Sequence, residues 1–329
     1  SQSGSGKTAV FAIASLQKVD IRQSATQILV LSNTRELAEQ TTKVMMSIGQ
    51  FMSLKTHTCI GGRSMDEDQR ALLGGAQVVS GTPGRVYDMI TRNILYTDKI
   101  VMLILDEADE MLSSGFKDQI YEIYRYLPPL QVVLCSATIP PSILELTKKF
   151  MTDPLNLLIQ KNKIPIHDIR QYIVHLPSNS LKLETFLDVY NSMTVGQTIV
   201  FANSRERVIW LTRKLESMSF SVTGINGEMT QRERDEAMVK FKDGHSRILV
   251  ATDIGGRGLD IEQVSLIVNF DFPFREDDYI HRIGRTGRFG RKGIAISFVL
   301  DEELATLDRI ERQYKLRIHD LPSDLEDLY

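Results

Sequence analysis

Short runs of Val, Ile and Leu alternate with longer amphipathic stretches along the whole chain. Such short apolar runs are typical of strands in a parallel sheet that is buried on both faces, and helices connect those strands in β-α-β units. The amphipathic stretches Arg35–Phe51 and Lys117–Tyr126 are two of the helices we expect in the first half. The first half contains five candidate strands, at Ile28–Leu31, His57–Ile60, Val78–Ser80, Val101–Leu105 and Val132–Cys135.

The alternation pauses at a polar segment that ends in the helix breaker Pro165, and then resumes. We therefore expect an N-terminal domain over residues 1–158, a linker over 159–168 and a C-terminal domain over 169–329. The second half has candidate strands at Tyr172–Leu176, Thr198–Phe201, Ser221–Thr223, Ile248–Val250, Leu266–Asn269 and Ala295–Val299. Its candidate helices are Leu181–Met193, Glu206–Met218, Gln231–Phe241 and Glu302–Lys315. Both halves thus predict the same α/β class, a mostly parallel sheet with helices on both faces.

Length and composition agree with two globular domains. A chain of 329 residues exceeds the usual single core of about 150 residues. The longest apolar run, Ile100–Leu105, is far shorter than the roughly 20 residues that span a bilayer. A net charge of −3 does not indicate a whole-molecule attraction to nucleic acid. Cys59 and Cys135 lie within strand-like runs, which indicates buried thiols in a reducing compartment and so an intracellular protein.

The sequence opens on a glycine-rich stretch directly before an apolar helical run. Glycines let the backbone turn tightly and aim its N–H groups at an anion, and in such a loop the lysine reaches the β- and γ-phosphates while the threonine hydroxyl binds Mg²⁺. A linker that happens to precede a lysine is the alternative. We expect a nucleotide, with its magnesium ion, at Gly4, Ser5, Gly6, Lys7 and Thr8.

The apolar run Val101–Leu105 leads straight into an acidic sequence, Asp106-Glu107-Ala108-Asp109. In a phosphate-loop enzyme, acids at the end of a strand hold the metal and polarise the attacking water. We expect Asp106 to hold Mg²⁺ and Glu107 to act on the water. The alternative is an acidic helix N-terminus, where carboxylates are favoured by the helix dipole.

Further motifs extend over nearly the whole chain. They are D-E-A-D at Asp106, T-R-E-L-A at Thr34, Gly61-Gly62, T-P-G-R at Thr82, S-A-T at Ser136, I-V-F-A-N-S-R at Ile199, Gln231 with Arg234, T-D-x-x-x-R-G-x-D at Thr252 and H-R-I-G-R-T-G-R at His281. Together these motifs resemble those of the DEAD-box RNA helicases. The runs G-F-K-D-Q-I-Y, R-I-L-V-A-T-D and Y-I-H-R-I-G-R are most similar to the translation initiation factor 4A group of that family, including its exon-junction paralogue.

The resemblance implies two RecA-like domains and an ATP-dependent RNA helicase that uses ATP and Mg²⁺. It implies that Arg285 and Arg288 act as arginine fingers toward the γ-phosphate. The two residues are three positions apart, so they would point to the same side if they lie on a helix. Asp260 is similar to the acid that binds the ribose. The segment that reads adenine in this family lies upstream of Ser1, so we expect the given chain to be truncated.

Coupling and RNA contacts also follow from the resemblance. Ser136, Thr138, Asp109 and His281 match positions that couple nucleotide state to closure of the two lobes, although a structural histidine is an equal alternative for His281. For Arg205 and Arg234 an ordinary helix-surface charge is the alternative. The positions that match RNA contacts are Thr34, Arg35, Gly62, Thr82, Gly84 and Arg85 in the first half, and Asn203, Arg205, Gln231, Arg234 and Thr252 in the second.

These residues suit contacts to phosphates and 2′-hydroxyls, which carry little sequence information. The expected ligand is therefore single-stranded RNA or a short duplex without sequence specificity. An ATP-locked RNA clamp that serves as an assembly platform shares every motif, and a DNA helicase, a phosphate-loop GTPase and a small-molecule kinase are weaker alternatives. We expect a monomer that does not bind membranes, acts in the cytoplasm or alternatively the nucleus, and works with a helical-repeat scaffold protein.

Overall fold

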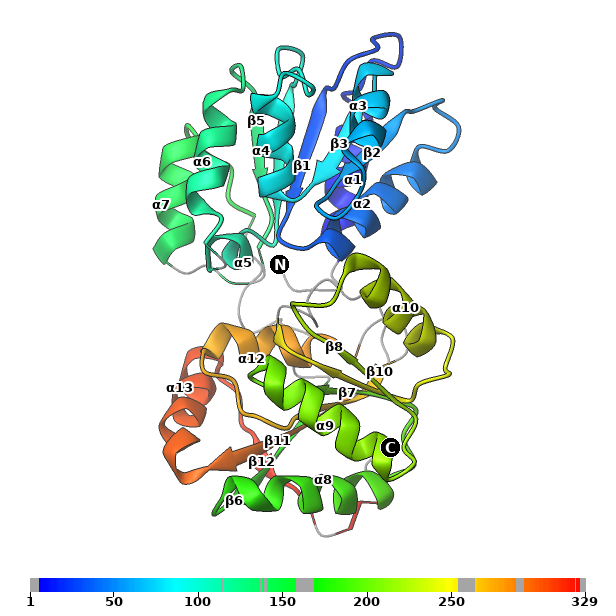
Figure 1. Ribbon diagram of the computed structural model, residues 1–329. Coiled ribbons are helices and arrows are strands. Elements are labelled where there is room, and N and C mark those ends of the chain that lie inside the picture. The colour runs from blue at the N-terminus through cyan, green and yellow to red at the C-terminus, as the bar shows by residue number, and fades with distance from the viewer. Residues whose placement is uncertain are drawn as a thin grey trace. The chain divides into compact units, whose positions relative to one another are not determined.

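The computed structural model describes residues 6–113, 115–136, 138, 141–157, 169–253, 264–287, 293–322 and 324–325. It divides into two compact units, Ser1–Leu158 and Ile159–Tyr329. The expected linker over 159–168 lies outside the described residues. Each unit is a sheet with helices packed against it (Figure 1).

The described strands of the first unit form one parallel sheet in the order β2-β3-β1-β4-β5. Because all run in the same direction, their carboxyl ends meet at one edge, which is where α/β proteins place their ligands. Ser32 and Asp106 are paired at that edge, at the ends of two neighbouring strands. The strands are β1 (Ile28–Ser32), β2 (Thr56–Cys59), β3 (Val78–Gly81), β4 (Met102–Asp106) and β5 (Gln131–Leu134).

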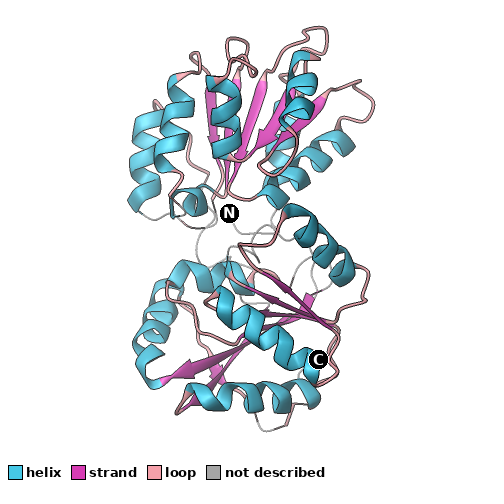
Figure 2. Ribbon diagram, viewed as in Figure 1, coloured by secondary structure: helices cyan, strands magenta, loops and turns pink. Residues whose placement is uncertain are grey.

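Alternate residues of these strands enter two cores, so helices cover both faces of the first sheet (Figure 2). Ile28 and Val30 pack on one face with Phe11 and Met45. Leu29 and Leu31 pack on the other. The first face is covered by α1 (Lys7–Leu16) and α2 (Arg35–Ile48), and the second by α3 (Met65–Leu73), α4 (Pro83–Thr91), α5 (Ala108–Ser113), α6 (Lys117–Arg125) and α7 (Pro141–Phe150).

The second unit repeats this plan with a longer sheet. Its described strands are all parallel, in the order β12-β6-β11-β10-β7-β9-β8. The strands are β6 (Ile169–Leu176), β7 (Gln197–Phe201), β8 (Val222–Ile225), β9 (Ile248–Ala251), β10 (Val264–Asn269), β11 (Gly293–Leu300) and β12 (His319–Asp320).

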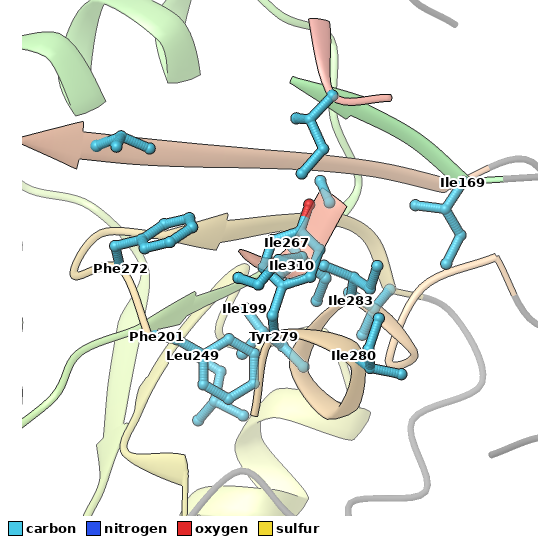
Figure 3. Close-up of a cluster of buried hydrophobic side chains, with 14 of the residues drawn as sticks. Ile169, Ile199, Phe201, Leu249, Ile267, Phe272, Tyr279, Ile280, Ile283 and Ile310 are labelled. Atoms are coloured by element: carbon cyan, nitrogen blue, oxygen red, sulfur yellow. The ribbon is translucent and has the colours of Figure 1, made fainter. Parts of the chain in front are cut away.

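Two cores again lie on opposite faces of the second sheet. In the core drawn in Figure 3, Tyr279 packs with Ile199, Leu249 and Ile283, and its hydroxyl donates a hydrogen bond of 2.9 Å to Gln171 Oε1. This anchors the helix that carries Tyr279. The drawn core is covered by α10 (Gln231–Lys242), α12 (Glu276–Ile283) and α13 (Leu304–Tyr314), and the opposite core by α8 (Lys182–Asn191) and α9 (Arg205–Ser217).

The expected fold class, two α/β units with parallel sheets between helices, is confirmed. Every expected strand overlaps an observed one, and the elements not expected are short, such as α3, α4 and the two-residue β12. Within the described residues, no helix combines the length and the apolar character that crossing a membrane requires. Both cysteines are free thiols, with Cys59 buried and Cys135 half-buried.

Candidate functional site

The N-terminus of α1 faces the acidic end of β4. Gly6, the residue before the helix, has φ 82°, a left-handed conformation that glycine adopts without steric cost. Burial lowers the pKa of the Lys7 ammonium, and the carboxylates of Asp106 and Glu107 act against that shift. Lys7 is therefore close enough to both acids to interact with them electrostatically. Gly4 and Ser5 lie outside the described residues.

Asp106 ends β4 with only 2% of its surface exposed. Its pKa is raised to about 7, first by burial and then by the neighbouring Glu107 carboxylate, while the Lys7 ammonium opposes the shift. Glu107 has φ 51°, and its N–H donates a hydrogen bond of 3.1 Å to Asp106 Oδ1. A left-handed conformation at a residue other than glycine is strained by about 1–3 kcal/mol, and such strain gathers at functional sites.

The oxygen donors here fit a magnesium ion. Mg²⁺ prefers carboxylate and hydroxyl oxygens, and it is usually held by one or two carboxylates together with the phosphates of its substrate. Thr8 supplies a hydroxyl in the first turn of α1, and Asp106 supplies a buried carboxylate at the end of β4. A cation would compensate the clustered negative charge that raises the pKa of Asp106.

Asp109 ties the acidic segment to the segment that follows β5. Its Oδ2 accepts hydrogen bonds from the backbone N–H of Thr138 at 2.9 Å and from Thr138 Oγ1 at 2.6 Å. The Ser136 hydroxyl in turn donates to the carbonyl oxygen of Thr138. All three side chains are buried, and these hydrogen bonds join the acidic residues to Ser136 and Thr138.

A different surface lies at the carboxyl ends of β1, β2 and β3. Thr34 caps α2, and its Oγ1 accepts a hydrogen bond of 3.2 Å from the N–H of Leu37. Gly62 follows β2 with φ 85°, and Thr82 is the N-cap of α4. Hydroxyls, helix N-termini and a glycine turn, which are groups that can bond phosphate oxygens, thus lie at the ends of neighbouring strands.

The other expected RNA residues of this unit lie at the same edge. Gly84 and Arg85 are in the first turn of α4, and Arg35 begins α2. A Cβ placed on Gly61 would lie 3.3 Å from the guanidinium of Arg35, so the glycine leaves room for that side chain. The side chain of Arg85 is only 10% exposed.

The second unit repeats this arrangement at the ends of β7, β8 and β9. Asn203 follows β7, Gln231 and Arg234 are in the first turn of α10, and Thr252 follows β9. Arg234 donates a hydrogen bond of 3.2 Å to the carbonyl oxygen of Asn226, and Gln231 donates one of 2.9 Å to Asp235. Arg205, at the start of α9, forms ion pairs with Glu206 and Glu228.

Arg285 does not lie on a helix, so the condition under which it would share a side with Arg288 is not met. Helix α12 ends at Ile283, because Gly284 is its C-cap, and Arg285 lies in the turn that follows. The backbone N–H of Arg285 donates to the carbonyl oxygen of Arg282 at 3.1 Å, and its Nε–H donates to the carbonyl oxygen of His281 at 3.1 Å. Arg285 and His281 are both buried. Arg288 and Asp260 lie outside the described residues.

Arg282 is an important residue that the sequence did not single out. It is 1% exposed, and its guanidinium makes two hydrogen bonds to Asp253, of 2.6 and 2.7 Å. It also donates to Asn203 Oδ1 and to the carbonyl oxygen of Asp271, each at 2.7 Å. Arg282 therefore joins the ends of β7, β9 and β10. The available signal was its position beside Ile283 and three residues after Tyr279, on the buried face of α12.

Replacing Arg282 by methionine is expected to lower the free energy of unfolding of the second unit by about 3 kcal/mol or more, because Asp253 loses its bidentate partner. Urea unfolding followed by the fluorescence of Trp210, the only tryptophan of the chain, reports on this unit. Arg309→Met is the matched control, because its ion pair with Glu276 is exposed and worth about 1 kcal/mol at most. Equal losses in the two variants would contradict the role of Arg282.

The chain has two α/β units with parallel sheets, and the first has a lysine at a helix N-terminus beside an acidic strand end. These features are those of the phosphate-loop nucleoside triphosphatases. The profile of the DEAD/DEAH box helicases matches residues 1–146, and that of the helicase conserved C-terminal domain matches residues 181–290. The chain therefore belongs to the DEAD-box RNA helicase family, and the sequence-based resemblance is confirmed.

Relatives over nearly the whole length agree with this assignment. The chain is 50% identical to an ATP-dependent RNA helicase FAL1 of Mycosarcoma maydis, over 99% of this chain and 83% of that protein. It is also 50% identical to eukaryotic initiation factor 4A-3 of Nicotiana plumbaginifolia, over 99% of this chain and 84% of that protein. Among solved structures, S. cerevisiae Dbp5 bound to RNA and ADP BeF3 has a TM-score of 0.92 at 35% identity, covering 98% of this chain and 84% of that one.

Proposed function

We propose that this chain is an RNA-dependent ATPase of the initiation factor 4A type, which opens short RNA duplexes when ATP closes its two lobes on one strand. The N-terminal lobe corresponds to residues 1–158 and the C-terminal lobe to 169–329. The observation that carries the proposal is that two groups of residues occupy different parts of the carboxyl edge of the first sheet. Lys7 and the acids lie at the end of β4, while hydroxyls and glycines lie at the ends of β1, β2 and β3.

The first part of this edge is proposed to bind ATP. Gly4, Ser5 and Gly6 wrap the phosphates, and Lys7 neutralises the β- and γ-phosphates. Thr8 and Asp106 hold the magnesium ion, which supplies charge neutralisation on the phosphates when it is bound. Glu107 orients the attacking water and accepts its proton. The strained backbone of Glu107, fixed by its N–H bond to Asp106, supports this role because it sets the direction of the carboxylate.

The second part is proposed to bind RNA through its backbone. Thr34, Arg35, Gly62, Thr82, Gly84 and Arg85 form this surface in the N-terminal lobe, and Asn203, Arg205, Gln231, Arg234 and Thr252 form its counterpart. Support comes from the chemistry of these residues, which suits phosphates and 2′-hydroxyls but not base edges. The RNA in the solved Dbp5 complex agrees with this ligand class.

Asp260 is proposed to bind the ribose, and Arg285 and Arg288 to reach the γ-phosphate from the C-terminal lobe. Ser136, Thr138, Asp109 and His281 would then couple nucleotide state to closure. Support within one unit comes from the two hydrogen bonds between Asp109 and Thr138, which join the acids to the segment after β5. Two ligands that favour the same closed state bind cooperatively, and hydrolysis releases both.

The test compares ATP hydrolysis with and without a single-stranded RNA, beside a strand-displacement assay on a short duplex. We expect RNA to stimulate hydrolysis strongly, a DNA of the same sequence to stimulate it less, and the duplex to open only with ATP. If RNA stimulates hydrolysis but no strand is displaced, and the RNA complex is long-lived with a non-hydrolysable ATP analogue, the protein is an RNA clamp. If RNA gives no stimulation, the proposal is wrong.

We further propose that the chain acts as a monomer inside the cell, in the cytoplasm or the nucleus, together with a helical-repeat scaffold protein. A structure of Dbp5 bound to Gle1 and IP6 is a neighbour with a TM-score of 0.79, which supports a partner protein of some kind in this group. Analytical ultracentrifugation of the chain alone tests the monomer.

A further inference from the structure

The guanidinium of Arg85 is directed into the N-terminal unit and is held there by three groups. Its Nε–H donates a hydrogen bond of 3.2 Å to the carbonyl oxygen of Ile60, and its Nη2 donates to the carbonyl oxygen of Arg63. Asp68 Oδ2 lies 2.9 Å from Nε and compensates the positive charge. The two carbonyls stand at the beginning and the end of the turn between β2 and α3, and α4 brings Arg85 against them.

Asp68 is itself fixed from a third element. Its side chain, on α3, is 1% exposed, and its Oδ1 lies 2.7 Å from Nε2 of His57 on β2. The Asp68 carboxylate therefore contacts the His57 ring through one oxygen and the Arg85 guanidinium through the other. Removing either partner would leave a buried carboxylate poorly compensated, which lowers the free energy of unfolding. The three side chains connect β2, α3 and α4, whose places in the first unit are labelled in Figure 1.

The turn that Arg85 spans is the one that carries the glycine pair. Gly62 adopts φ 85° and is exposed, and the guanidinium of Arg35 fills the space beside Gly61. Glycines in a turn allow close approach of another backbone to the N–H groups. That approach requires the turn to keep one shape, and the two hydrogen bonds from Arg85 to its ends restrict that shape.

We propose that Arg85 supports RNA binding as a positioning residue, by bracing the turn Ile60–Arg63 with Asp68 and His57, and not by neutralising a phosphate. Its charge is already compensated by Asp68, and its Nε and Nη2 donors are engaged by backbone carbonyls. Turning it toward RNA would break both bonds and leave Asp68 buried without its cation. This inference rests on the proposed RNA binding of the same edge, and it replaces the direct contact proposed there for Arg85 by a supporting role.

The salt dependence of RNA affinity separates bracing from direct contact. Each phosphate that a cationic side chain neutralises adds about 0.7 to the slope of log K against log [salt] for a single strand. The dissociation constant of a fluorescent single-stranded RNA, with a non-hydrolysable ATP analogue, is measured over a range of KCl concentrations. For Arg85→Gln we expect affinity to fall roughly tenfold, with the slope unchanged. A slope that falls by about 0.7 overturns the inference.

Two further variants keep the outcome decisive if Arg85→Gln is poorly folded. Arg85→Lys keeps the charge beside Asp68 but cannot span both carbonyls. Bracing predicts that it binds RNA as weakly as Arg85→Gln, whereas a phosphate contact predicts near wild-type affinity, because lysine also binds phosphate. Asp68→Asn should weaken binding as much as Arg85→Gln, and the double variant should be no weaker than either alone. Additive losses would contradict a shared brace.

The matched control is Arg70→Gln, which removes an exposed charge on α3; among the described residues its side chain bonds only the carbonyl of Asp66. It should bind RNA as the wild type does, and a tenfold loss there would show that any charge removed from this unit has the same effect. If the wild type itself binds no RNA, the proposed function fails. If it binds RNA and Arg85→Lys is normal, only the brace fails.

Discussion

Replacing Arg285 by alanine is expected to lower RNA-stimulated ATP hydrolysis by about 10³- to 10⁵-fold, because a guanidinium at the γ-phosphate stabilises charge that develops in the transition state. Arg285 lies in the turn after α12, where the carbonyl oxygen of His281 holds its Nε–H at 3.1 Å. That bond holds the stem of the side chain in the turn. ATP and RNA affinities should change far less than turnover, because the contact matters most in the transition state.

The comparison needs a matched loss of charge. Arg275→Ala removes an exposed arginine at the other end of α12, close to Asp277, and should retain full turnover. Arg285→Lys should recover little, since an ammonium lacks the planar fork that pairs with two phosphate oxygens. Steady-state hydrolysis at saturating RNA, with ATP varied, separates kcat from KM. Wild-type turnover in Arg285→Ala would show that this arginine is not a finger.

The sheets could be predicted from the sequence because parallel strands bury both faces and so become continuous apolar runs. Ile28–Leu31 and Ile248–Val250 were expected, and strands begin at the same residues. Short connecting helices gave no such signal. Helix α4 begins at Pro83, and its nine residues bury only Pro83, Val86, Met89 and Ile90. The two-residue β12 is held by its pairing with β6, a contact distant in sequence.

The motif residues could be found because their spacing along the chain is diagnostic. The contacts that hold these side chains in place could not be predicted, because the residues that make them are distant in sequence. Arg85 is braced by Asp68 and His57 through contacts that only the fold brings together. Arg282 and Arg285 belong to the same motif at His281, yet the structure buries Arg282 against Asp253 and places Arg285 beyond the helix end. Burial is decided by packing on the sheet, which charge alone does not reveal.

Replacing Glu107 by glutamine is expected to slow ATP hydrolysis by about 10²- to 10⁴-fold, the usual contribution of a general base. The amide keeps the size of the side chain, and the backbone N–H bond to Asp106 Oδ1 does not depend on it. ATP and RNA should therefore still bind. Because hydrolysis is the step proposed to open the lobes, the variant should hold RNA much longer than the wild type in the presence of ATP.

Single-turnover hydrolysis and the dissociation rate of a labelled RNA, both measured with ATP, test the two halves of this expectation. Glu122→Gln is the matched control, because Glu122 is an exposed residue of α6 that pairs only with Arg125 among the described residues, and neither rate should change. Slow hydrolysis with long-lived RNA supports a base whose chemistry drives release. Slow hydrolysis with rapid RNA release would contradict this expectation. It would mean that the Glu107 carboxylate is needed to form the closed state, because the uncharged amide then prevents closure before ATP is cleaved.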